Sequence, residues 1–181
     1  MQVFVLVILA TIMKFIVLIA LLLLPSLAFA GEGEAINKSQ GIGVIKSGLK
    51  VPRFVSLKSK KANIRVGPGV DYPIKFVYQR RNMPLEVIEE FGNWRKVRDV
   101  EGGEGWVLHS LLTGKRHALV KDESVMFNVY KGERAVMRLG KDVQVEVNEC
   151  RRMQCEVKFE GTKGWVVKPN LWGVYADEQF D

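Results

Sequence analysis

The side chains best suited to redox or metal chemistry are few in this 181-residue sequence: two cysteines and two histidines. Cys150 and Cys155 are separated by four residues, whereas a thioredoxin-type redox site has two residues between its cysteines. His109 and His117 lie far from this pair and are not at the spacing of metal ligands. In an exported chain, an adjacent cysteine pair is most simply a disulfide, so the pattern predicts a structural bridge and no metal site.

No other group of residues favours catalysis. Nucleophilic catalysis needs a Cys or Ser beside a base that a third group orients, and two scattered histidines do not provide this. We interpret His109 as a solvent-exposed turn residue, and His117, at the junction between the modules, in the same way rather than as a base. Glu89 and Glu90 do not form a catalytic carboxylate pair, because adjacent strand residues point to opposite faces, and we interpret them as surface charges. Gly67-Pro68-Gly69 is not a phosphate-binding loop, because no helix follows it to supply the anion site. We therefore expect a protein that is not an enzyme and needs no cofactor, with an atypical hydrolase as the weakest alternative.

The N-terminal segment has the pattern of a signal peptide. The stretch after Met13 begins with Lys14, continues as the apolar run Phe15–Leu24 and ends in Ala28-Phe29-Ala30, a small-x-small cleavage site. For this signal, Met13 is a better start than Met1. We expect residues 1–30 to be removed, which places the mature chain in the periplasm or outside the cell.

An uncleaved membrane anchor is the alternative for this segment, because about 22 apolar residues are enough to span a bilayer. Lys14 would then lie within the span, at a cost of a few kcal/mol, and the Ala-Phe-Ala site would have no purpose. Cleavage is therefore the favoured interpretation, with membrane contact only through the signal peptide during export.

The charge pattern narrows the possible partners. The formal net charge is +7, from 27 Lys and Arg against 20 Asp and Glu. Such a balance can favour nucleic acid, anionic lipid or an anionic polymer. Because the basic residues are scattered among acidic ones without a long basic run, we expect no nucleic-acid partner.

The rest of the chain reads as an all-β protein. Residues 31–52 are polar and glycine-rich, which is typical of a flexible leader. From Arg53 onward, short β-branched or alternating runs are interrupted every few residues by Gly, Pro, Asn or Asp, as in a small sandwich or barrel. The strands expected in the first half are Phe54–Lys58, Asn63–Val66, Ile74–Tyr78, Leu85–Glu90, Trp94–Asp99 and Gly105–Leu108.

An internal repeat predicts two modules. Gly105-Trp106-Val107 recurs as Gly164-Trp165-Val166, and Leu85-Glu86-Val87 recurs as Val145-Glu146-Val147. The modules span residues 54–116 and 117–177, and each is marginal in size for independent folding, so an extensive interface between them is expected. The valines and Leu85 should face inward and the glutamates outward. The tight hairpin turns that need positive φ are expected at Gly102, Gly103 and Gly161.

These residues resemble the bacterial SH3-like domain family of exported Gram-negative proteins. The resemblance rests on Arg53–Ser59, Asn63–Gly69, Asp71-Tyr72-Pro73, Asn93-Trp94, Glu104–Val107 and, in the second copy, Cys150-x4-Cys155, Gly164–Val166 and Leu171–Tyr175. It covers residues 50–177. The second module departs from the pattern, since its loop reads Asn128–Gly132 without prolines and Gln154 stands where Trp94 stands in the first.

The resemblance implies two tandem SH3-like β-barrels used for protein or peptide recognition, often at the cell wall, and it does not imply a catalytic activity. SH3-like barrels hold extended peptides on an aromatic shelf, for which Tyr72, Tyr78 and Trp94 are the candidates. Arg80 and Arg81 could pair with a ligand carboxylate. Core packing is the competing interpretation for these aromatic residues, as it is the preferred one for the two repeated Gly-Trp-Val tryptophans.

Two functions follow as expectations. The first is a binding module for cell-envelope ligands, either peptidoglycan peptides or a periplasmic protein. The second is a structural or assembly scaffold in a periplasmic complex, without a small ligand, which the altered loop of the second module favours.

Overall fold

The computed structural model describes residues 47–181. The expected signal peptide, residues 1–30, and most of the expected leader lie outside the described residues. Between residues 47 and 181, no helix has the length and apolar character needed to cross a bilayer. The same part of the chain contains no cluster of three or more His, Cys, Asp or Glu side chains suited to hold a metal ion.

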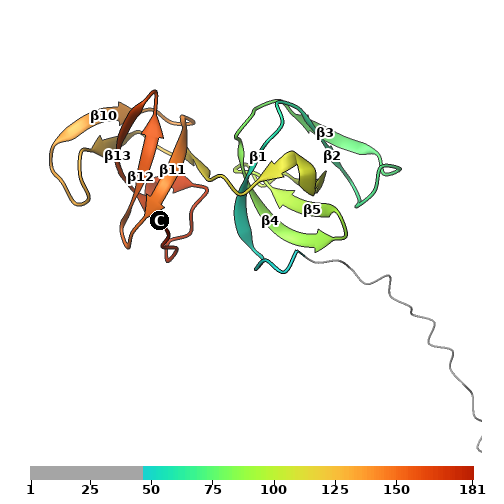
Figure 1. The fold of residues 1–181 in the computed structure, drawn as a ribbon. Helices are drawn as coiled ribbons and strands as arrows, with labels where there is room; N and C mark the ends of the chain where they lie inside the picture. The colour runs from blue at the N-terminus through green and yellow to red at the C-terminus, as the bar shows by residue number, and fades with distance from the viewer. Residues whose placement is uncertain (1–46) are drawn as a thin grey trace, which may run out of the picture. The chain divides into compact units, whose positions relative to one another are not determined.

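The first barrel is a seven-stranded antiparallel sheet in the order β3-β2-β6-β5-β4-β1-β7, with a single 3-10 turn, η1, before its last strand (Figure 1). The expected strands are confirmed to within one residue at nearly every end. Their bounds are β1 (Arg53–Leu57), β2 (Ala62–Arg65), β3 (Ile74–Tyr78), β4 (Pro84–Phe91), β5 (Trp94–Arg98), β6 (Glu104–Leu108), η1 (His109–Leu111) and β7 (Leu112–Thr113).

The second barrel repeats this topology in the order β10-β9-β13-β12-β11-β8-β14. The prediction of two tandem all-β modules is therefore confirmed. Its elements are β8 (His117–Val120), β9 (Ser124–Phe127), β10 (Ala135–Leu139), β11 (Gln144–Cys150), β12 (Gln154–Phe159), β13 (Thr162–Val167), η2 (Lys168–Asn170) and β14 (Leu171–Trp172).

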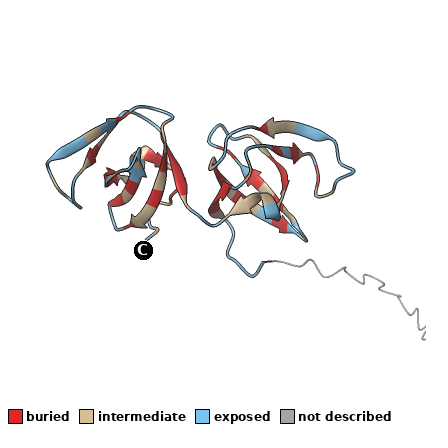
Figure 2. Ribbon diagram, turned by 45° about the horizontal axis from the view of Figure 1, so that its top comes forward, coloured by how far each residue is buried: buried red, intermediate tan, exposed pale blue. Residues whose placement is uncertain are grey.

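Each barrel has its own apolar core, formed by the inward positions of its strands. Leu85 and Val87 are fully buried in the first core, and Val145 and Val147 hold the matching positions in the second. Figure 2 shows the buried residues along the strands of both barrels. The repeated tryptophans, Trp106 and Trp165, are also buried, as core packing predicts.

The disulfide between Cys150 and Cys155 is confirmed, and it joins β11 to β12. Two of the three expected turn glycines, Gly102 and Gly161, have positive φ values of 86° and 82°. Gly103 does not, so that part of the prediction is wrong. It is a close approach that requires glycine there, because a Cβ atom would lie 2.6 Å from an Asp99 carboxylate oxygen.

The two barrels belong to one compact unit and share a packed junction. The Phe54 ring packs edge-on against Trp172 and lies 4.7 Å, centroid to centroid, from Tyr175. The Tyr175 hydroxyl donates a hydrogen bond of 2.9 Å to Glu86 across the same junction. Aromatic packing of this kind buries apolar surface that each small barrel would otherwise expose.

His117 corrects one prediction from the sequence. It is buried on β8 rather than exposed in a turn, and its Nδ1 lies 3.0 Å from the Ser56 hydroxyl of the first barrel. Burial lowers the pKa of His117, and the charge of Lys115 adds to this effect while that of Glu146 opposes it. The residue is therefore a neutral junction residue, placed by a contact between modules.

Glu90 corrects another prediction. Its side chain is buried rather than a surface charge, and it binds the Arg53 and Arg95 guanidinium groups at 2.6 and 3.0 Å. The neighbouring Glu89 carboxylate is exposed, as strand alternation requires. Burial raises the pKa of Glu90, but hydrogen bonds from Ser47 and Arg53 outweigh it and lower the pKa to about 2.

Candidate functional site

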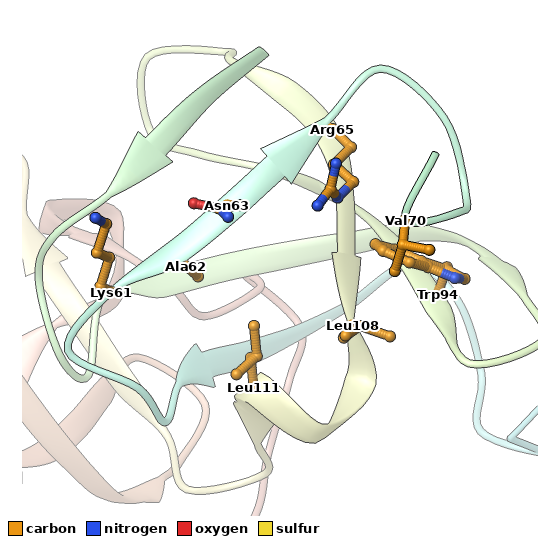
Figure 3. Close-up of a pocket in the computed structure, with 8 residues that line it drawn as sticks. All are labelled: Lys61, Ala62, Asn63, Arg65, Val70, Trp94, Leu108 and Leu111. Carbon is orange, nitrogen blue, oxygen red and sulfur yellow. The ribbon is translucent and has the colours of Figure 1, made fainter. Parts of the chain in front are cut away.

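A groove of about 400 Å³ lies on the first barrel, between β2, the loop that follows it, and the ends of β5 and β6. Figure 3 shows Val70 and Trp94 at one end and Lys61 at the other, with Asn63 and Arg65 along β2. Leu108 and Leu111 form the opposite wall. Ala62 completes the lining.

The alternation of β2 decides which of its side chains reach the groove. Asn63 is exposed and Arg65 is half-buried, and both reach the groove. Ala62 and Ile64 are buried, and of these two only Ala62 borders the groove. Trp94 opens β5 directly after the hairpin turn at Gly92, whose φ of 52° a glycine adopts without strain. The strand ladder therefore fixes the polar wall, and the hairpin fixes the indole.

Tyr72 belongs to the loop that follows β2 and is absent from the lining of the groove. Its ring packs on the loop glycines: a Cβ atom at Gly67 would lie 2.3 Å from Tyr72 Cδ1, and one at Gly69 would lie 3.1 Å from Cδ2. Its carbonyl oxygen accepts a 2.6 Å hydrogen bond from Arg65 Nη1. These contacts hold the loop that carries Val70, and they leave Tyr72 47% exposed as a whole residue.

Tyr78 is a core residue. It is buried, and its hydroxyl donates a 2.7 Å hydrogen bond to Asp99 Oδ2. Burial raises the pKa of Tyr78 far above its usual value, and the Asp99 carboxylate raises it further. Asp99 also accepts hydrogen bonds from the backbone of Glu101 and Gly103. This cluster fixes the β5–β6 turn, so Tyr78 does not join Trp94 on a shelf.

Arg80 and Arg81 lie at the junction with the second barrel. Arg80 Nη2 donates to the Asp142 carbonyl oxygen at 3.2 Å, and Gln144 Nε2 donates to the Arg81 carbonyl oxygen at the same distance. Of the five residues singled out by sequence, the structure therefore brings only Trp94 into the groove. Lys61, Arg65 and Val70 were missed, although the outward position of Arg65 on a predicted strand was a usable signal.

The groove is apolar at one end and cationic along its polar wall. Lys61 and Arg65 are its two charged lining residues, and no acidic side chain lines it. Neither cation forms an ion pair with any residue between 47 and 181, the described part of the chain. Such a surface can hold an apolar or aromatic group beside a carboxylate.

The second barrel does not reproduce this surface. Gln154, which stands in the place of Trp94, is buried and accepts a 2.7 Å hydrogen bond from the Lys131 backbone. The Tyr130 ring packs edge-on against Trp165, and the Arg151 guanidinium lies 4.8 Å from the Trp165 ring centroid. An arginine therefore covers the aromatic pair there.

The chain matches one protein family by sequence and is similar, more weakly, to several solved structures. The family model described as "Bacterial SH3 domain" matches residues 58–114 and again residues 123–173. No curated protein matches the chain.

Solved structures similar to the chain include three proteins with NlpC names. NlpC2 and NlpC1 of Trichomonas vaginalis are 9% and 10% identical, with TM-scores of 0.33 and 0.32 over 68% and 70% of this chain. An NlpC/P60 family protein of Bacillus cereus ATCC 10987 is 12% identical, with a TM-score of 0.31 over 66%. The matched regions are 49%, 47% and 56% of those chains, so this chain spans about half their length. TM-scores this low do not establish a shared overall arrangement.

Proposed function

This chain belongs to the bacterial SH3 domain family, and from that premise we propose that it is a non-catalytic binding protein of the cell envelope. Its groove on the first barrel takes short peptides that carry a carboxylate. Bacterial SH3 domains typically belong to extracellular or cell-envelope proteins, and the signal-peptide pattern of residues 1–30 agrees with that location.

The observation that carries the proposal is the composition of the groove. Trp94 and Val70 offer an apolar end, and Lys61 and Arg65 offer two cations without an acidic neighbour in the lining. A guanidinium binds a carboxylate by charge-assisted hydrogen bonds, while an indole gives contact area at a small entropic cost. Peptidoglycan stem peptides present carboxylates on short extended chains, and they are the ligand class we favour over a periplasmic protein segment.

A catalytic role has little support in the described residues. Cys150 and Cys155 are oxidised to a disulfide, and His117 is buried against Ser56. His109 is exposed on η1, where it lines another cavity of the first barrel and not the groove. No base therefore stands beside a nucleophile at the groove.

The proposal is tested by titrating the protein with soluble muropeptides, the sugar–peptide fragments that a muramidase releases from the wall, while following tryptophan fluorescence. Val70→Asp adds a negative charge at the apolar end and should weaken binding by at least about tenfold. Val129→Asp is the matched control, because Val129 is a similarly exposed loop valine of the second barrel. If both variants bound the wall fragments with equal affinity, the groove would not be the binding site.

A scaffold role is the second candidate, and the end strands of the two sheets favour it. Within residues 47–181, β3 and β10 each pair with one neighbouring strand only, and each exposes an apolar residue, Ile74 or Val136. Unpaired strand edges are templates for pairing with another chain. Concentration-dependent self-association, measured by sedimentation velocity and abolished by Ile74→Lys, is the result that this alternative expects.

A further inference from the structure

We propose that the second barrel carries a ligand site of its own, which takes the C-terminal end of a peptide whose last side chain is apolar. The site is a pocket of about 540 Å³ at the end of β13, η2 and β14. It shares no residue with the groove of the first barrel. This inference therefore stands or falls independently of the function proposed above.

The walls of this pocket are largely apolar. Val167 and Leu171 come from the end of β13 and from β14, and Val174 comes from the chain after β14. Met153, in the turn between β11 and β12, closes another side and is 57% exposed. An exposed methionine beside a half-open apolar pocket is a surface that adapts to an apolar side chain.

Lys168 gives the pocket a polar interior. It is 5% exposed, and its ammonium donates hydrogen bonds to the carbonyl oxygens of Ala176 and Glu178. The Glu178 carboxylate is engaged by Arg116 at 2.6 Å, and Lys168 forms no ion pair within the described part of the chain. An ammonium has three donors, so one remains for an acceptor that enters the pocket. The charge of Lys168 also helps to lower the pKa of the Glu178 carboxyl, so this cation is partly balanced within the protein. The attraction for an anionic ligand therefore comes chiefly from the cations at the rim.

The rim of the pocket has the same sign of charge. Lys121 and Arg152 are exposed there, neither is ion-paired to a residue in the range 47–181, and no acidic residue lines the pocket. Three cations around an apolar cavity are complementary to an apolar group that ends in a carboxylate. A free peptide C-terminus combines these two features.

In the first barrel, residues of the chain lie beside the corresponding place. The backbone hydrogen bond from Lys168 to Met153 has its counterpart in the bond from His109 to Asn93. There, His109 and Leu112 line a cavity of about 270 Å³ together with Ser47 and Leu49, residues of the segment that precedes β1. The matching pocket of the second barrel is larger, and the segment that follows β14 reaches its lining only at Val174 and Ala176 before Phe180 pairs with Cys150.

The buried ammonium also favours a peptide over a lipid. A fatty acid would place its hydrocarbon tail in the interior, where the remaining Lys168 donor would find no acceptor. A peptide end offers carbonyl and carboxylate oxygens to Lys168 and an apolar side chain to Leu171 and Val174. A volume of about 540 Å³ is enough for such a side chain and the adjoining backbone.

The test is an amide-resolved NMR titration of the protein, purified as the expressing cells process it. The probes are the peptide acetyl-Gly-Ser-Gly-Leu-Phe with a free carboxylate, its C-terminally amidated twin, and decanoate. We expect the free-acid peptide to shift the amides of Met153, Val174 and Ala176. The amidated twin should bind about tenfold more weakly, as for a lost charge-assisted hydrogen bond.

The variants are chosen at exposed positions so that the fold is kept. Lys121→Glu and Arg152→Glu should each weaken the free-acid peptide by about tenfold or more, while Lys141→Glu, an exposed lysine outside the lining, should not. Trp94→Ala, in the other barrel, should leave these shifts unchanged. Equal binding of the two peptides, binding by decanoate alone, insensitivity to both rim variants, or no shift at millimolar peptide would each overturn the proposal.

Discussion

Glu90 and Arg95 lie directly opposite each other on β4 and β5, with 3.0 Å between Oε1 and Nε, at the place where the second barrel has its disulfide. Cys150 and Cys155 are paired in the same way on β11 and β12, sixty positions further along the chain. One barrel thus closes this hairpin with a buried ion pair and the other with a covalent bond. Because both barrels link the two strands at these matching positions, we infer that this end of the hairpin has to be held together in each module.

The buried ion pair makes stability depend on acid. The pKa of Glu90, about 2 in the folded state against an ordinary 4.5, means that its stabilisation is complete above about pH 4.5 and is lost as the pH falls towards 2. Glu90→Gln should therefore lower the free energy of unfolding at pH 7 by about 3 kcal/mol. Urea unfolding of both proteins between pH 7 and 2 should show their difference shrinking below pH 4.5.

Glu89→Gln is the matched control for this experiment. The Glu89 carboxylate is exposed, so its loss should change stability by less than about 0.5 kcal/mol. A difference between the wild type and Glu90→Gln that stayed constant from pH 5 to 2 would contradict the assignment of acid sensitivity to Glu90.

The disulfide should stabilise the second barrel by a modest amount. Cross-linking residues five positions apart contributes on the order of 2 kcal/mol through the entropy of the unfolded chain. The double variant Cys150→Ala/Cys155→Ala should unfold at a correspondingly lower urea concentration, and a reductant should move only the wild type. An unchanged midpoint after full reduction would show that the bridge is not a stabilising element.

His117 should make the junction sensitive to mild acid. Its folded pKa lies below the ordinary 6.5, so the unfolded chain binds the proton more readily and stability is lost as the pH falls below about 6.5. The neighbours of the ring are Ser56, Glu146 on β11 and Lys115. The melting temperature of the wild type should fall more between pH 7.5 and 5.5 than that of His117→Gln. His109→Gln, at an exposed position, should keep the wild-type dependence of the melting temperature on pH. A dependence that is lost in His109→Gln and kept in His117→Gln would contradict this account.

Tyr78→Phe separates core packing from ligand binding. Removing the hydroxyl leaves Asp99 without one of its partners and should lower stability by about 1–2 kcal/mol. Because Tyr78 does not line the groove, the affinity for wall peptides should stay within about twofold of the wild type. A variant of normal stability with lost affinity would place Tyr78 at the ligand instead.

The strands could be predicted because their information is local. Ile74–Tyr78 was predicted with its observed bounds, and the repeat of Gly-Trp-Val located the same strand in both modules. Period-2 alternation and turn glycines depend on neighbouring residues only, so one sequence is enough to read them. The disulfide followed from the proximity of its cysteines for the same reason.

Apart from Gly103, whose close neighbour Asp99 is only four residues away, the errors arose from contacts between distant residues. His117 was expected at the junction but exposed, because the sequence does not show that Ser56 of the other module packs against it. Glu90 was expected at the surface because the sequence does not show that Arg53 and Arg95 surround it. Tyr78 was assigned to a shelf because an aromatic residue at a strand end has the same local signal whether it faces a groove or Asp99. Pairings of this kind depend on how the sheet closes, which local patterns do not encode.

The central claim is that the first-barrel groove binds the cell wall, and co-sedimentation with purified peptidoglycan sacculi across a salt series tests it most directly. We expect binding by the wild type and by Val129→Asp that weakens but is still measurable at about 0.5 M salt, where exposed charges are largely screened and the apolar end of the groove is not. Val70→Asp and Trp94→Ala should stay in the supernatant. Binding that disappears with salt, or that is equal in all four proteins, would reduce the interaction to nonspecific attraction between a basic protein and an anionic polymer and would contradict the account.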